Sequence, residues 1–181
     1  MKTPFGFRGW SLFGATLALW LLAGGAVSAQ AQAVKPRLGI YDSRAIAVAY
    51  ANSAEFRDTL KAAQGDYQQA KADKDEKKAT EIGAKMKLMQ RRMHEQGFST
   101  GSVAGIMSKI KDKLPGVAKE AGVQAILSKW ELNYQSADIE VVDVTDAVVA
   151  LFRVSDKGKE WIKGVRAQPP VPMEQITDDL D

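Results

Sequence analysis

Apolar and polar residues alternate in three short stretches of the chain, and this period of two predicts β-strands. The stretches span residues 37–42, 123–134 and 139–142, and the polar residues 135–138 connect the last two. We therefore expect a small sheet with one buried face. The alternating residues are Leu38 and Ile40, then Trp130, Leu132 and Tyr134, then Ile139 and Val141.

After the first stretch the apolar residues recur every three or four positions, which predicts helices. We expect Ser43 to cap a short helix and Asn52 or Ser53 to cap a much longer one. The long helix carries a narrow apolar seam with the 4-3-4 spacing of a coiled coil, and the next segment repeats it. The seam residues are Phe56, Leu60, Ala63, Tyr67 and Ala70, followed by Ile82, Met86, Met89 and Met93.

Residues 71–78 separate the two halves of the seam and are charged except for one alanine, Ala72. This interruption predicts the tip of an antiparallel helical hairpin over residues 53–96. A continuous helix is the alternative, because only the aspartates in this segment disfavour a helix.

Glycine and proline divide the rest of the helical region. Gly97 suits the position just past a helix end, and a return helix is expected over residues 103–121. Pro115 would kink or restart that helix and Gly122 would end it.

Two further caps follow the last strand. Thr145 is expected to cap a helix, so that residues 123–152 form a strand–strand–helix unit, and Ser155 is expected to cap a final helix. The predicted fold class is α+β, with a small three-stranded sheet, a protruding coiled-coil-like helical hairpin and flanking helices.

The first residues resemble a targeting segment. Lys2 and Arg8 precede an apolar run at residues 10–23, and small residues suited to cleavage follow at 27–29 and 31–33. We therefore interpret residues 1–33 as a secretory signal peptide, with an uncleaved membrane anchor as the alternative. A single domain is expected over residues 34–166, followed by a proline-rich, acidic, disordered tail over residues 167–181.

The chain has no cysteine. An exported protein without disulfides must be stabilised by packing or oligomerisation, and the combination suggests a bacterial periplasm. The formal net charge is +3, but the charge is unevenly placed. Residues 53–121 hold 14 Lys and Arg against 10 Asp and Glu, whereas residues 173–181 hold four acidic residues and no basic ones. Nucleic acid is not an expected partner, because the compartment is wrong and no basic–aromatic motif appears.

Two segments resemble the Skp/OmpH family of periplasmic chaperones. The segment VAKEAGVQAILSKWELNYQSADIEVVDVTDAVVAL, residues 117–151, has the family's helix ending at glycine, its strand, its aromatic residue before a polar turn, and its Asp-Val-Thr-Asp-x-Val helix start. The segment RLGIYDSRAIAVAYANSAEF, residues 37–56, resembles the family's first strand and its turn into the arm. The chain departs from the family in its short, mildly basic arm, in the break at residues 97–102 and in the tail.

The resemblance implies a function. In that family, strands of three subunits form a β-body, and helical arms hold unfolded outer-membrane proteins without ATP or a cofactor. We therefore expect a homotrimer, and the residues expected in its sheet and oligomer core are Ile40, Trp130, Leu132, Tyr134 and Val141. The basic arm residues expected to meet clients or anionic lipid are Lys61, Lys71, Lys74, Lys77, Lys78, Lys85, Lys87, Arg91 and Arg92.

Catalytic chemistry has little support in the sequence. His94 is the only histidine, so one chain cannot form an ordinary His/Cys zinc site. Asp42 and Asp143 would approach each other if the first and third strands pair, and two carboxylates can transfer protons or bind Ca²⁺. We interpret them instead as a turn residue and a residue before a cap, and we predict no catalytic or metal-binding residue. The predicted function is an ATP-independent holdase, with a non-catalytic envelope adaptor that binds one partner as the alternative.

Overall fold

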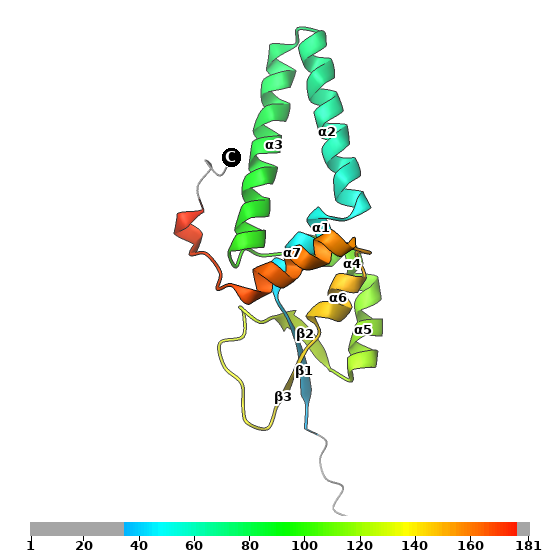
Figure 1. Cartoon of the computed structure of the whole chain (residues 1–181), viewed down its shortest axis with the longest axis vertical. Helices are drawn as coiled ribbons and strands as arrows, with labels where there is room; N and C mark the ends of the chain where they lie inside the picture. The colour runs from blue at the N-terminus through cyan, green and yellow to red at the C-terminus, as the bar shows by residue number, and fades with distance from the viewer. Residues whose placement is uncertain (1–34, 177–181) are drawn as a thin grey trace, which may run out of the picture. The chain divides into compact units, whose positions relative to one another are not determined.

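The computed structural model describes residues 35–176. These residues form a helix-rich domain with a small parallel sheet, which confirms the predicted α+β class (Figure 1). The elements in chain order are β1 (Arg37–Tyr41), α1 (Ser43–Ala51), α2 (Ala54–Ala72), α3 (Glu76–Phe98), α4 (Ala104–Ile110), the 3₁₀ turn η1 (Lys111–Lys113), α5 (Leu114–Ala121), β2 (Ala125–Ser128), β3 (Glu140–Asp143), α6 (Thr145–Ala150), α7 (Asp156–Ala167) and the 3₁₀ turn η2 (Met173–Gln175). The predicted signal peptide lies outside the described residues.

The sheet has the strand order β2-β1-β3, and both pairs are parallel. Leu38 lies opposite Ala125 on one side and Val141 on the other. The strands nearest in sequence, β2 and β3, are therefore separated by β1. The segment between β1 and β2 supplies helices α1 to α5, as parallel pairing of these two strands requires, and helices α6 and α7 follow β3.

The second strand is shorter than we expected. It ends at Ser128, where the chain turns because the amide of Glu131 donates to the Ser128 carbonyl at 3.1 Å. Trp130, Leu132 and Tyr134 lie in the loop that follows, and Tyr134 is 83 % exposed. The prediction that these three residues alternate on a strand is wrong.

Helix α1 lies at the centre of the core. Ala45, Ala47, Ala49 and Ile46 are buried in one cluster with Val148 of α6 and Ile162 of α7. The short alanine side chains let the neighbouring helices approach closely. The sheet face that bears Tyr41 packs against the same cluster.

The predicted hairpin is present, and the continuous-helix alternative is not adopted. Helices α2 and α3 are antiparallel and are joined by residues 73–75, where Lys74 has a left-handed backbone (φ 57°) (Figure 1). The carboxylate of Asp75 accepts from the Lys78 amide at 2.9 Å and so caps α3. The turn therefore lies in the middle of the charged segment that predicted it.

Some expected caps are present and others lie one residue away. Ser53 caps α2, and Ser155 caps α7. Asp42 caps α1 in place of Ser43, because its carboxylate accepts from the Arg44 amide. Gly97 lies inside α3, which ends one residue later at Phe98.

The return helix is broken as the sequence predicted. The 3₁₀ turn η1 separates α4 from α5, and Pro115 lies in the first turn of α5. Gly122 ends α5 in the left-handed conformation, with φ 66°. A side chain at this position would be strained, so glycine is required here.

Residues 168–176, which we expected to be disordered, make defined contacts with the domain. The side chain of Arg44 donates to the Gln168 carbonyl at 2.9 Å, and the Val171 amide donates to the Phe98 carbonyl at 2.8 Å. Ile176 is 6 % exposed. The proline-rich segment therefore lies against the domain, since both of its ends make contacts.

Candidate functional site

The two hairpin helices lie closest together near the tip (Figure 1). Ala70 and Ala79 are buried there, where α2 and α3 meet. Toward the base both helices contact α1, and the hairpin opens (Figure 1). The seam side chains are consequently half-exposed instead of closed against each other.

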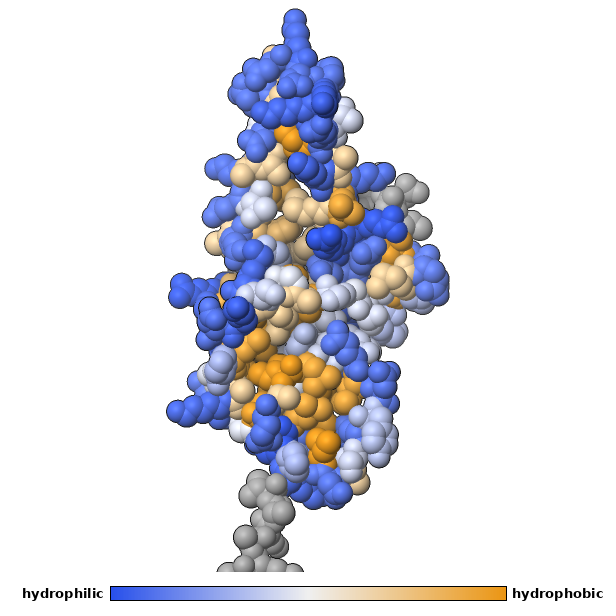
Figure 2. Space-filling model, turned by 180° about the vertical axis from the view of Figure 1, so that it is seen from behind, coloured by the Kyte–Doolittle hydropathy of each residue, from blue (hydrophilic) through white to orange (hydrophobic). Residues whose placement is uncertain are grey.

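A groove of about 590 Å³ runs along this opening. Its lining is mainly apolar and includes most of the seam residues that the sequence predicted. Hydrophobic surface lies between hydrophilic rims along the hairpin (Figure 2). The lining residues used below are Phe56, Leu60, Tyr67, Met86, Met89 and Met93, with Lys87 and Gln90 at the rim.

A second groove of about 530 Å³ lies on the other side of the seam, between the hairpin base and α4. It shares Phe56, Met89 and Met93 with the first groove, so these three side chains separate the two hollows. Lys109 lies beside it, donates to Glu55 at 2.6 Å and lies over the Tyr50 ring. The hydrogen bond to Glu55 and the interaction with Tyr50 raise the pKa of Lys109, so it is a fixed positive charge at this groove.

The nine basic arm residues are all exposed, but the structure does not gather them into one patch. Lys87 borders the first groove, and Lys85 and Arg92 border the second. Lys71, Lys74, Lys77 and Lys78 lie at or near the tip. Lys61 lies on α2, and Arg91 pairs with Glu95 on α3 at 3.0 Å.

The second face of the sheet is also apolar. Ile40 and Val141, both predicted for the oligomer core, share this face with Leu38 and Leu127. All four remain partly exposed. A hydrophobic patch is visible at this end of the domain (Figure 2).

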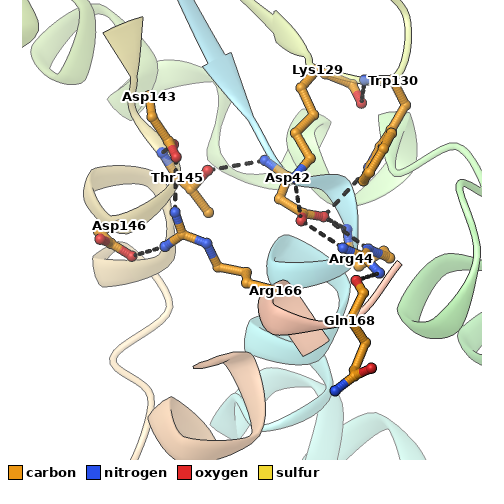
Figure 3. A network of polar contacts seen from close by, with 10 residues as sticks. Asp42, Arg44, Lys129, Trp130, Asp143, Thr145, Asp146, Arg166 and Gln168 are labelled. Carbon is orange, nitrogen blue, oxygen red and sulfur yellow. Dashed lines mark hydrogen bonds and ion pairs between the residues drawn. The ribbon is translucent and has the colours of Figure 1, made fainter. Parts of the chain in front are cut away.

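A polar network lies at the carboxyl ends of the parallel strands (Figure 3). Asp42, after β1, is 1 % exposed and pairs with Arg44 at 3.0 Å and Lys129 at 2.8 Å. The Trp130 indole also donates to Asp42 at 3.4 Å. The Lys129 amide still donates to the Tyr41 carbonyl at 2.9 Å, and the side chains of Lys129 and Trp130 turn toward the Asp42 carboxylate just past the end of β1.

Asp143, after β3, belongs to a separate pair. Its carboxylate accepts from the Thr145 amide at 2.8 Å and pairs with Arg166 at 2.8 Å, and Arg166 also pairs with Asp146. Thr145 is not the N-cap that we expected: it is the first residue of α6, and its hydroxyl accepts from the Asp42 amide at 3.0 Å. The first and third strands do pair, and Thr145 lies between the two aspartates.

The electrostatics of Asp42 suit a structural anion better than an acid–base group. Burial alone would raise its pKa, but hydrogen bonds and charge from Arg44 and Lys129 lower the pKa of Asp42 to about 2. A carboxylate with so low a pKa is a weak base near neutral pH. Within residues 35–176 there is no group of three or more His, Cys, Asp or Glu side chains arranged to hold a metal ion.

Comparison of the chain with protein-family models, with curated proteins and with solved structures finds no match in any of the three. Within the described part of the chain, no helix combines the length and hydrophobicity that a membrane span needs. The resemblance to the Skp/OmpH family therefore stays a prediction. The fold and the site define an α+β protein with an open, apolar helical hairpin.

The sequence indicated the seam but not the grooves. A 4-3-4 spacing shows which residues face each other, whereas the gap between them depends on the contacts of both helix bases with α1.

The Asp42 network was also not predicted from the sequence. Its sequence signal is a strand followed by Asp-Ser-Arg, which places an acid and a base two residues apart at a strand end.

Proposed function

We propose that this protein is an ATP-independent holdase of the periplasm that binds unfolded exported proteins in the grooves of its helical hairpin. The observation that carries the proposal is the open apolar groove between α2 and α3. Half-exposed methionine and aromatic side chains on a folded domain favour association with other apolar chains.

The side chains that line the groove suit clients of varied sequence better than a single partner of fixed shape. Met86, Met89 and Met93 are unbranched and polarisable, so they can adapt to different side chains. Lysines at the rims would attract acidic segments of a client or anionic lipid. Because the groove is already open, client binding in this proposal needs no nucleotide or other cofactor.

The proposal also includes a homo-oligomer, a trimer by resemblance, formed through the apolar sheet face that carries Ile40 and Val141. Several hairpins around one body would surround a client with several grooves, which raises the effective concentration of binding sites.

The test is suppression of aggregation. Several unrelated outer-membrane proteins are diluted from urea with the purified protein at near-stoichiometric ratios, and light scattering is followed. We expect the wild type to suppress scattering of all of them and Met86→Glu to lose most of this effect, because a charge in the groove opposes apolar binding. Ala62→Glu is the matched control, since Ala62 is exposed on α2 and lines neither groove.

Absence of suppression by the wild type for every client would overturn the holdase proposal. Suppression that is equal in Met86→Glu and in Ala62→Glu would overturn the assignment to the groove. Stable copurification of one folded protein, without suppression, would instead support the adaptor alternative.

A further inference from the structure

The segment after α7 passes the carboxyl end of α3 and turns toward the hairpin (Figure 1). The hydrogen bond from the Val171 amide to the Phe98 carbonyl fixes this crossing point. Ile176 is buried, so the chain is anchored again five residues later. The end of the described chain is therefore held against the domain at Val171 and at Ile176.

A stripe along α3 leads from this crossing point toward the tip. Phe98, His94, Arg91 and Lys87 are spaced by four, three and four residues, so they share one face of the helix. Lys87 also borders the first groove. At 1.5 Å per residue, Arg91 lies ~10 Å and Lys87 ~16 Å along the helix from Phe98.

The segment 177–181 has the sequence Thr-Asp-Asp-Leu-Asp, with three acidic residues and no basic one. Asp178 and Asp179 follow the buried Ile176 by two and three residues, and an extended chain of that length spans up to ~7 to 10 Å. The 3₁₀ turn η2 and the crossing at Val171 lie on the α3 side of the hairpin (Figure 1), so this reach extends from that side toward the two cations of the stripe.

We propose that the acidic segment 177–181 docks on the α3 stripe and pairs with Lys87 and Arg91, where it covers the rim of the first groove. The occupant of this surface is a segment of the same chain, because the charges are complementary and the anchor at Val171 delivers the segment there. The segment would then compete with clients for the groove, a consequence that rests on the proposed function.

Docking is tested by a distance that needs no client. The chain has no cysteine, so nitroxide labels can be placed at Leu180→Cys and Ala84→Cys, on the stripe, and their distance measured by pulsed electron resonance. We expect a short, narrow distribution that broadens in Lys87→Glu/Arg91→Glu and narrows again when Asp178→Lys/Asp179→Lys is added. The matched control is Lys85→Glu/Arg92→Glu, the same charge change on the rim of the other groove, which should leave the distance unchanged.

Equal distributions in both charge-reversal variants would overturn the docking. Loss of the short distance on dilution with unlabelled protein would show that another copy supplies the segment, and would also overturn the proposal.

Competition is measured separately with a fluorescent, urea-unfolded outer-membrane protein. Asp178→Asn/Asp179→Asn/Asp181→Asn should bind it about two- to tenfold more tightly than the wild type, as expected for the loss of one or two exposed ion pairs. Equal affinity of the wild type and this variant for the client would overturn the claim that the segment competes with clients. A wild type and variant that both fail to bind would overturn the proposed function, while the distance would still report the docking.

Discussion

The Arg44 guanidinium donates to both carboxylate oxygens of Asp42 inside the domain: Nε donates to Oδ1 at 3.2 Å, and Nη2 donates to Oδ2 at 3.0 Å. Asp42 is 1 % exposed and Arg44 is 2 % exposed. Arg44 also donates to the Gln168 carbonyl, so the pair ties β1 and α1 to the segment after α7. A buried pair of this kind contributes little by being formed and is costly to break, because the remaining charge has no solvent.

We therefore expect Asp42→Asn to lower the free energy of unfolding by about 3 to 5 kcal/mol, since it leaves Arg44 charged and buried. Urea unfolding followed by circular dichroism measures this loss. Asp156→Asn, which removes one partner of an exposed pair with Lys159, is the control and should leave the midpoint near that of the wild type. Equal losses in the two variants would contradict the structural role of the buried pair.

The same pair predicts an acid limit to stability. The pKa of Asp42 is lowered to about 2 in the folded protein, below the ordinary value of about 3.9. A lowered pKa contributes stability that is fully present above pH ~4 and is lost as the pH falls toward ~2. The wild type should thus lose about 2 kcal/mol over this interval through Asp42 alone.

Urea unfolding at several pH values between 2 and 6 checks this expectation. Asp42→Asn has no group to titrate at this position, so its stability should fall less steeply below pH 4. Parallel curves for the two proteins would contradict the assignment.

The Thr145 hydroxyl links the start of α6 to the residue that follows β1, because it accepts from the Asp42 amide at 3.0 Å in a buried site. Thr145→Val keeps the shape but leaves that amide unpaired, and should cost about 1 to 3 kcal/mol. Thr80→Val is the control, because its exposed hydroxyl bonds only to the carbonyl of Glu76 in its own helix. Urea unfolding measures the free energy of unfolding of both variants. A Thr145→Val protein as stable as the wild type would show that this hydrogen bond does not stabilise the domain.

Thr145 also shows what could be predicted from the sequence. Ser155 and Gly122 were predicted correctly, and Ser53 is one of the two caps expected for the long helix, because a cap depends on its immediate neighbours. The hydroxyl of Thr145 instead bonds to a residue more than 100 positions away, which no local pattern reveals.

The predicted strand through Tyr134 failed for the same kind of reason. Its alternation is real, but β1 ends at Tyr41, so the residues beyond Lys129 have no further β1 residue to pair with, and the side chains of Lys129 and Trp130 contact the distant Asp42 instead. The residues that line the groove could be predicted from the spacing of the apolar seam. The width of the groove could not, because the separation of α2 and α3 depends on their contacts with α1.

Two glycines in the region after α3 should respond oppositely to substitution. A Cβ at Gly101 would lie 2.8 Å from the backbone of Glu95, which cannot move without disturbing α3. Gly101→Ala should therefore destabilise the protein by about 1 to 3 kcal/mol. A Cβ at Gly105, inside α4, meets nothing within 4 Å, so Gly105→Ala should stabilise it by up to about 1 kcal/mol. Thermal unfolding of both variants tests the pair, and a Gly101→Ala protein as stable as Gly105→Ala would show that the loop is not held in this conformation.

The apolar sheet face gives the prediction with the widest consequence for function. Val141 and Ile40 are partly exposed on a face that the proposed oligomer would bury. Light scattering coupled to gel filtration should give the wild type three times the protomer mass. Val141→Glu should give a folded monomer, because a carboxylate at the interface would be buried without a partner. Leu88→Glu, which places the same charge on an exposed position of α3, should keep the wild-type mass. A monomeric wild type at tens of micromolar would remove the enclosed space between hairpins, and client holding would then have to depend on a single pair of grooves.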